Sequence, residues 1–184
     1  MKEVMKTGGK LAAICAIAAI ALGIVNAITE PIIIAARAER LKLALSKLST
    51  GLDIGEFSAV DEEGSIKGYY PLTGSEGTEA YIINVIGAGY AGDMNLLTSI
   101  SLEGEILSVA LMENTETPGL GKEAENDSYM EMFVGTGKDS VIPSSKSHLN
   151  SKDADSITGA SITFIGIGKA LNEASIFVSQ LGGM

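Results

Sequence analysis

The 184 residues are enough for one soluble domain and an additional segment, but not for two ordinary domains. Residues 1–42 hold six Lys or Arg against three Asp or Glu, whereas residues 43–184 hold seven against twenty. An acidic domain repels phosphate backbones, so we predict no nucleic-acid partner. The chain has one cysteine, Cys15, and one histidine, His148. These counts exclude an internal disulfide, a Cys-rich or multi-His zinc site and an iron–sulfur cluster built from this chain alone.

An apolar segment lies close to the N-terminus. Leu11 to Ile28 contains no charged residue, and apolar character resumes at residues 32–34. This length approaches the roughly 20 residues that a membrane-spanning helix needs. Basic residues at Lys2, Lys6 and Lys10 precede the segment, and basic flanks normally remain in the cytoplasm. We therefore expect a single-pass protein of the cytoplasmic membrane, in contact with lipid, with its soluble domain on the extracytoplasmic side.

The expected organisation has four parts. Residues 1–9 form a cytoplasmic N-terminus, residues 10–34 the transmembrane helix, residues 35–50 a connecting helix and residues 51–184 an extracytoplasmic domain. A cleaved signal peptide is the alternative, with Val25-Asn26-Ala27 as a small-residue cleavage site. The apolar run exceeds the roughly 7–15 residues of a signal-peptide core, which favours the transmembrane interpretation.

Glu30 lies beside Pro31 at the end of the apolar segment. A carboxylate inside a membrane can be functional, but the neighbouring proline indicates an interfacial position where the helix breaks or kinks. The spacing of leucines from Ala35 to Leu48, with basic residues between them, predicts a helix that leads towards the domain.

The soluble part has the pattern of an α+β domain with an antiparallel sheet and flanking helices. Glycine-rich residues 50–80 predict short strands and turns. Further expected strands are 65–70, 80–86, 95–102, 106–112 and 140–142, and the two around the Glu103-Gly104 turn form a hairpin in an antiparallel meander. A short helix is expected at 127–133. Apolar residues at helical spacing from Ile167 to Leu181 predict a terminal amphipathic helix, which Gly182-Gly183 would stop.

Three segments could carry chemistry. Residues 87–92 match G-x-G-x-x-G after a strand, but another strand follows, so a close-approach turn is favoured over a dinucleotide site. Residues 115–122 join a proline turn to two glycines and a lysine, as in a surface loop or an anion- or flavin-binding loop. Residues 155–163 precede the terminal helix, where hydroxyl groups either cap the helix or approach a phosphate.

The segment Asp155-Ser156-Ile157-Thr158-Gly159-Ala160-Ser161-Ile162-Thr163 resembles the flavinylation motif of FMN-binding domains in the Rnf and Nqr membrane electron-transfer complexes. The apolar N-terminal segment, Gly89-Tyr90 and the block Glu116-Thr117-Pro118-Gly119-Leu120-Gly121 follow the order of that family. The resemblance covers nearly the whole chain and is closer to the G subunits of Rnf complexes than to the longer Nqr C subunits.

The resemblance implies an electron-carrier subunit of an ion-translocating ferredoxin:NAD+ oxidoreductase, which is not catalytic alone. FMN would be joined covalently through its phosphate to Ser161, or alternatively to Thr163, by a flavin transferase that recognises Asp155. Two groups of cofactor-binding residues follow, the first contacting flavin and the second shaping the phosphate turn. They are Glu116, Thr117, Gly119, Leu120 and Gly121, and Thr158, Gly159 and Ala160. The implied partners are other Rnf subunits.

Two positions depart from the family pattern. Ser161 stands where the family usually has threonine, and Asn114 stands where a histidine is expected before the Glu-Thr-Pro block. Serine offers the same hydroxyl chemistry as threonine. An Nqr C-like subunit, or a flavin-free extracytoplasmic module for binding or structure, remains the alternative function.

Overall fold

The computed structural model describes residues 2–60 and 64–181. The chain divides into two compact units, Met1–Lys42 and Leu43–Met184, and each unit is described by itself. The first unit holds most of one long helix, and the second holds a sheet with shorter helices.

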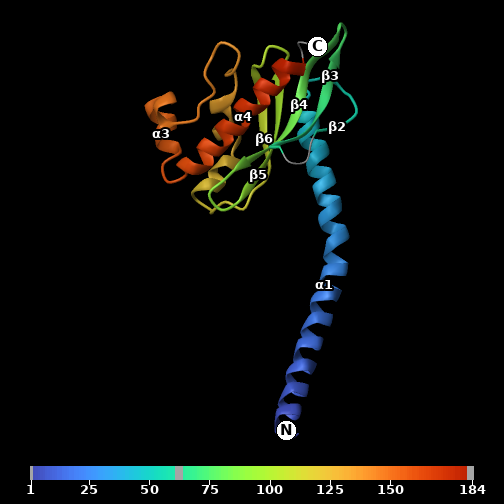
Figure 1. The fold of residues 1–184 in the computed structure, drawn as a ribbon. Coiled ribbons are helices and arrows are strands. Elements are labelled where there is room, and N and C mark those ends of the chain that lie inside the picture. The colour runs from blue at the N-terminus through green and yellow to red at the C-terminus, as the bar shows by residue number, and fades with distance from the viewer. Residues whose placement is uncertain (1, 61–63, 182–184) are drawn as a thin grey trace. The chain divides into compact units, whose positions relative to one another are not determined.

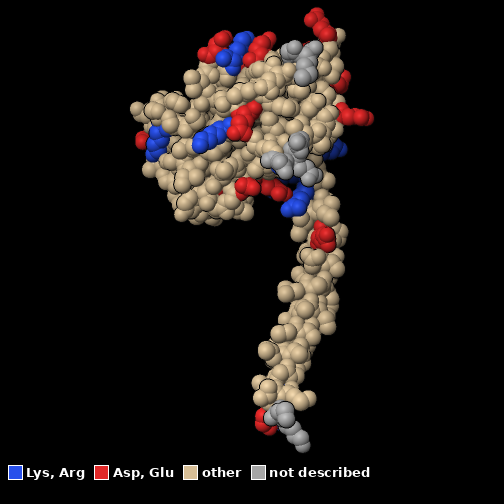
Figure 2. Space-filling model, in the orientation of Figure 1, with Lys and Arg blue, Asp and Glu red and all other residues tan. Residues whose placement is uncertain are grey.

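Helix α1 (Lys2–Leu48) has 47 residues and is continuous through Pro31. The break expected near Glu30 is therefore absent, and the segment expected as a separate connecting helix belongs to the same helix. Thr29 donates its hydroxyl to the Val25 carbonyl oxygen at 2.9 Å, so this polar side chain finds its partner within the helix. Among the described residues, α1 alone is long and apolar enough to cross a membrane, with a mean hydropathy of 2.5 and no buried residue in its apolar window. Figure 2 shows a long stretch of its visible face without charged side chains.

The second unit contains a six-stranded antiparallel sheet. Figure 1 shows its long strands side by side. Its main path runs β1-β3-β4-β5-β6, and β2 pairs with β3. Apolar side chains of the long strands, among them Val85, Leu96 and Val109, join the hydrophobic core. The predicted antiparallel meander is confirmed, with each long strand paired to the next. The strands are β1 (Asp53–Ile54), β2 (Ser58–Ala59), β3 (Ile66–Gly74), β4 (Gly77–Ala88), β5 (Asp93–Ser101) and β6 (Ile106–Glu113).

Helix α4 (Ser161–Leu181) lies across the sheet and is the amphipathic helix that the apolar spacing predicts. Its buried face includes Phe164, Ile167 and Leu171, which join side chains of β4 and β5 in one core. The Phe164 ring stacks on Phe133 with the centroids 5.2 Å apart. The α+β class is thus confirmed. The shorter helices are η1 (Gly121–Glu125), α2 (Asp127–Met130), η2 (Glu131–Phe133), η3 (Lys146–His148) and α3 (Ser151–Ser156).

Between β6 and the C-terminus, the structure differs from the sequence-based expectations at two places. The strand expected at 140–142 is wrong, because Ser140 forms only an isolated bridge with Gly137 and the next two residues are not in a strand. Helix α3 was not expected, although Asn150 caps it by accepting a hydrogen bond from the Asp153 N–H at 3.0 Å. The expected stop at residues 182 and 183 lies outside the described residues.

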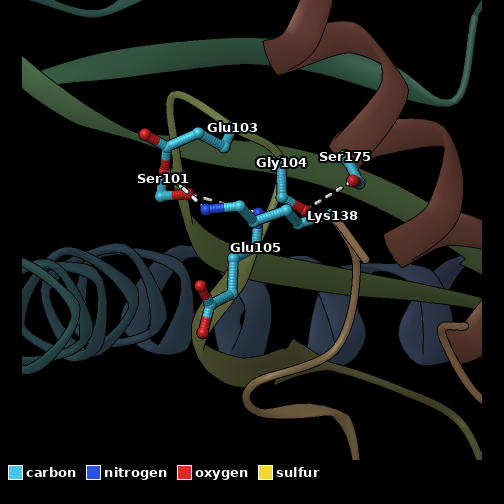
Figure 3. A network of polar contacts seen from close by, with 6 residues as sticks. All are labelled: Ser101, Glu103, Gly104, Glu105, Lys138 and Ser175. Atoms are coloured by element: carbon cyan, nitrogen blue, oxygen red, sulfur yellow. Dashed lines mark hydrogen bonds and ion pairs between the residues drawn. The ribbon is translucent and has the colours of Figure 1, made fainter. Parts of the chain in front are cut away.

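The hairpin between β5 and β6 contacts the second half of α4, away from the N-terminus of that helix. Gly104 adopts φ +90° in this turn, which a residue with a Cβ rarely adopts. Its carbonyl oxygen accepts a 2.6 Å hydrogen bond from the Ser175 hydroxyl, as Figure 3 shows. Lys138 and Glu103 form an ion pair at 3.8 Å across the same turn. Both contacts tie the hairpin and the loop after it to neighbouring elements.

The N-terminal half of α4 packs closely against the end of β4, because glycine residues stand at the point of contact. An added Cβ at Gly166 would lie 1.9 Å from the Ala88 carbonyl oxygen, so only glycine fits here without movement. An added Cβ at Gly87, on the strand side, would lie 3.1 Å from the Gly166 carbonyl oxygen. This close packing brings the N-terminus of α4 beside the loop that follows β4.

Candidate functional site

A pocket of about 390 Å³ lies where three chain segments meet. The segments are the β4–β5 loop, the loop between β6 and η1, and the turn that begins α4. These correspond to the three segments that sequence patterns single out as carriers of chemistry. The lining residues are Tyr90, Glu116, Thr117, Leu120, Gly121, Gly159, Ala160, Ser161, Ile162 and Thr163.

The β4–β5 loop is held by hydrogen bonds while its tyrosine remains exposed. The Gly89 N–H donates to the Gly92 carbonyl oxygen at 2.9 Å, and Thr115 donates its hydroxyl to the Ala91 carbonyl oxygen at 3.1 Å. Tyr90 is 73 % exposed and lines the pocket. The loop joins two antiparallel strands, so it lacks the strand-to-helix context of a dinucleotide fold.

Glu116 links all three segments. Only 3 % of this residue is exposed. Its Oε1 accepts a hydrogen bond from the Ala91 N–H at 3.1 Å, and its Oε2 accepts one from the Thr163 hydroxyl at 2.8 Å. Asn114 orients the same segment, because its Oδ1 accepts a bond from the Glu116 N–H at 3.0 Å. Asparagine thus provides a local acceptor at the position where the family pattern has histidine.

Two glycines leave room for the Glu116 carboxylate. An added Cβ would lie 2.2 Å from Oε1 at Gly89 and 2.1 Å from Oε2 at Gly121. Neither glycine has a positive φ, so close approach explains both, and at Gly89 an added Cβ would also lie 2.6 Å from the Gly92 carbonyl oxygen. A larger residue at either position would displace the side chain that joins the segments.

The two candidate hydroxyl groups at the start of α4 differ in environment. Thr163 is 1 % exposed and donates its hydroxyl to Glu116. Ser161 is partly exposed and lines the pocket, and its hydroxyl forms no hydrogen bond to the residues that the structure describes. The Phe164 N–H donates to the Ala160 carbonyl oxygen at 3.1 Å, which places Ala160 at the cap of the helix. The N–H groups of the first turn therefore precede the intrahelical bonds and are available to an anion.

The structure brings most of the expected site residues together. The expected residues that line the pocket are Glu116, Thr117, Leu120, Gly121, Gly159, Ala160, Ser161 and Thr163. Gly119, Thr158 and Asp155 are exposed and do not line it. Tyr90 and Ile162 line it without having been predicted as site residues. For Tyr90 the sequence did give an indication, because the surrounding glycine loop allows close approach to a ligand.

The side chain of Lys146, which the sequence did not indicate as a site residue, contacts the turn between α3 and α4. Lys146, in η3, donates a hydrogen bond from Nζ to the Thr158 hydroxyl at 3.0 Å. Thr158 in turn donates to the Ala154 carbonyl oxygen at 3.3 Å, and its N–H donates to the Asp155 carbonyl oxygen at 3.1 Å. These bonds order the turn between α3 and α4. No motif indicated this lysine, because the contact depends on how η3 folds back.

Tyr129 is the titratable group most affected by its surroundings in this region. Its side chain is buried and its hydroxyl has no hydrogen-bond partner among the described residues. Burial raises the pKa of Tyr129 above its ordinary value of 10.0, and the negative charge of Glu116 raises it further. The carboxylate therefore acts electrostatically on its neighbours inside the domain.

We predict that Tyr129→Phe alters stability at alkaline pH more than at neutral pH. A raised folded-state pKa means that the unfolded chain loses the proton first, so wild-type stability falls as pH rises above about 10. The phenylalanine variant lacks this loss of unfolding free energy. For one titrating group the loss is at most about 1.4 kcal/mol per pH unit. Urea unfolding at pH 7 and at several alkaline pH values above and below the ordinary tyrosine pKa measures the difference. Parallel stability curves for the two proteins over this range would contradict the prediction.

Comparison with known proteins agrees with the geometry. The FMN-binding domain family matches residues 89–175, which include all three segments of the pocket. The chain therefore contains an FMN-binding domain. The G subunit of a proton-translocating ferredoxin:NAD(+) oxidoreductase complex from Clostridium ljungdahlii is 27% identical over 169 residues, covering 92% of this chain and 88% of that protein.

Two further relatives have corresponding names. The G subunit of an ion-translocating oxidoreductase complex from Cereibacter sphaeroides is 31% identical, over 71% of this chain and 60% of that protein. The G subunit of a Na(+)-translocating ferredoxin:NAD(+) oxidoreductase complex from Acetobacterium woodii is 31% identical, over 46% of this chain and 42% of that protein. These relatives are subunits of multi-subunit complexes.

The pocket residues fit FMN as the ligand of this domain. A volume of about 390 Å³ lies within the roughly 300–1,000 Å³ of small-molecule and cofactor sites. Tyr90, Leu120 and Ile162 offer apolar surface to a ring system. The first turn of α4 offers N–H groups to a phosphate, and Gly159 at φ +89° shapes the turn before it.

Proposed function

We propose that this protein is an electron-carrier subunit with covalent FMN in a membrane-bound, ion-translocating ferredoxin:NAD+ oxidoreductase complex of the Rnf type. The names of its relatives and the FMN-binding domain support this assignment. FMN, when bound, supplies one- and two-electron transfer, and the protein contributes attachment, orientation and electrostatics. The protein is not catalytic alone, because it works with the other subunits of the complex.

Ser161 is the proposed attachment residue. The single observation that carries this choice is the contrast between a partly exposed Ser161 in the pocket and a buried Thr163 whose hydroxyl donates to Glu116. A transferase needs access to the acceptor oxygen, and the bond to Glu116 would have to break before Thr163 could react. Serine also has the hydroxyl that nucleophilic attack on phosphorus requires.

The attachment reaction uses FAD and a flavin transferase. The Oγ atom of Ser161 forms a bond to the phosphorus on the flavin side of the FAD diphosphate. The bond from that phosphorus to the bridging oxygen breaks, AMP leaves, and the proton of the serine hydroxyl is released with it. Asp155 is exposed on α3, six residues before Ser161, where the transferase could contact it during this step.

The N-terminal helix anchors the domain in this proposal. Residues 10–34 cross the cytoplasmic membrane in contact with lipid, and residues 1–9 remain in the cytoplasm. Residues 35–50, which include the end of α1, form the connection, and residues 51–184 lie outside. The uncharged stretch of α1 and the lysines that precede it support this orientation. The relatives differ in the ion that their names give, one proton and one Na(+), so the proposal names an ion-translocating complex.

Intact and peptide mass spectrometry of the protein, extracted from the membranes of a host that contains the flavin transferase, tests this function. We expect a mass increase of FMN minus one water molecule, located on Ser161 within the peptide that spans residues 156–169. Modification of Thr163 would retain the function and reject the choice of residue. An unmodified peptide would contradict the electron-carrier proposal and indicate a flavin-free module.

A further inference from the structure

The Glu116 side chain carries a charge that a purely structural role does not require. It is almost completely buried, lines the pocket, and receives one hydrogen bond on each oxygen, from the Ala91 N–H and from the Thr163 hydroxyl. A neutral glutamine could accept from the amide and donate to the hydroxyl oxygen, and would join the same segments. The hydrogen bonds therefore explain the position of the side chain but do not explain its charge.

No described basic residue neutralises this charge through an ion pair. The nearest lysine along the chain, Lys122, pairs with Glu125 at 3.7 Å. Lys146 directs its Nζ at the Thr158 hydroxyl. A buried carboxylate without a cation is costly, because its loss of hydration is not repaid by an ion pair.

The negative charge of Glu116 also affects a buried neighbouring side chain. Glu116 contributes to the raised pKa of Tyr129, whose own hydroxyl has no partner among the described residues. Solvent and salt screen a buried charge much less than an exposed one. Because Glu116 also lines the pocket, its negative charge will act on a group that binds there.

We propose that Glu116 is an electrostatic positioning residue, whose fixed negative charge at the pocket wall lowers the reduction potential of the flavin bound there. The inference rests on the proposed function, since it requires bound flavin. Electrons that arrive from a reduced donor protein add negative charge beside an existing negative charge, so the reduced state is disfavoured. Hydrogen bonds from two different segments hold the carboxylate in place, so that it cannot turn away from the added charge.

Glu116→Gln in the full-length, flavinylated protein tests the proposal, because it removes the charge and keeps the shape of the side chain. We expect the midpoint potential, measured by a spectroscopic redox titration of the purified protein, to become less negative than in wild type. We also expect the shift to persist at high ionic strength, because the site is shielded from salt. Mass spectrometry before the titration establishes whether each protein carries flavin.

Two control variants separate charge from geometry. Asn114→Ala removes the side-chain acceptor of the Glu116 N–H and keeps the charge of Glu116, so the potential should stay at the wild-type value. Glu76→Gln removes an exposed carboxylate at the β3–β4 turn, at the other end of the 12-residue strand β4 and roughly 35 Å away along it. It changes the net charge by the same amount and should leave the potential unchanged.

Each outcome supports or overturns the inference. A higher potential in Glu116→Gln alone supports it. An unchanged potential in Glu116→Gln, or an equal rise in Asn114→Ala, overturns it and assigns Glu116 to geometry only. Loss of flavin from a folded Glu116→Gln protein also overturns it, because the residue would then act in attachment. Absence of flavin from wild type would instead reject the proposed function itself.

Discussion

Ser161→Ala should yield folded protein that contains no covalent flavin after expression with the flavin transferase. The substitution removes the only partly exposed hydroxyl of the two candidates at the start of α4, while Thr163 remains buried and bound to Glu116. Because the serine side chain packs little, its removal should change the free energy of unfolding by no more than about 0.5 kcal/mol. In-gel flavin fluorescence and intact mass measure the modification, and circular dichroism checks the fold.

Thr163→Ala is the matched comparison for Ser161→Ala. It should still carry flavin, but it leaves Oε2 of Glu116 buried without its donor, at a cost of about 1–3 kcal/mol. Ser161→Thr should retain the modification, because the hydroxyl is preserved. Covalent flavin in Ser161→Ala, together with its loss from a folded Thr163→Ala protein, would reverse the assignment. The double alanine variant should carry none.

Gly166→Ala should destabilise the domain more than any other single added methyl group in α4. The new Cβ would lie 1.9 Å from the backbone oxygen of Ala88, and a backbone atom at the end of a paired strand cannot move aside as a flexible side chain would. Overpacked cores typically lose about 1–3 kcal/mol, and we expect this variant at or above the upper end of that range. The measurement is urea unfolding followed by circular dichroism.

Lys169→Ala controls for the helix propensity of alanine, because Lys169 is an exposed position of the same helix. Its stability should stay within about 0.5 kcal/mol of wild type. The Gly166 variant should also lose flavin, since α4 must move away from the β4–β5 loop and open the pocket. Wild-type stability in Gly166→Ala would show that the helix and strand are not in close contact.

Much of the fold was predictable from local patterns. The apolar spacing from Ile167 to Leu181 predicted α4, and the runs of β-forming residues around Glu103-Gly104 predicted the hairpin of β5 and β6. Such patterns depend on which side chains face the core, and that information is present in the order of residues. The expected strand at 140–142 failed because a short apolar run carries no periodicity and takes whatever conformation its neighbours impose.

The sequence by itself determined that an apolar helical segment without charged residues precedes an acidic α+β domain, and that the chain resembles flavinylated domains. The tertiary structure alone decided that Glu116 reaches both Ala91, 25 residues earlier, and Thr163, 47 residues later. These contacts distinguish the hydroxyl groups of Ser161 and Thr163, because residues two positions apart on a helix point towards different surroundings. Burial and hydrogen-bond partners arise from contacts between distant segments, and no local pattern of residues encodes them.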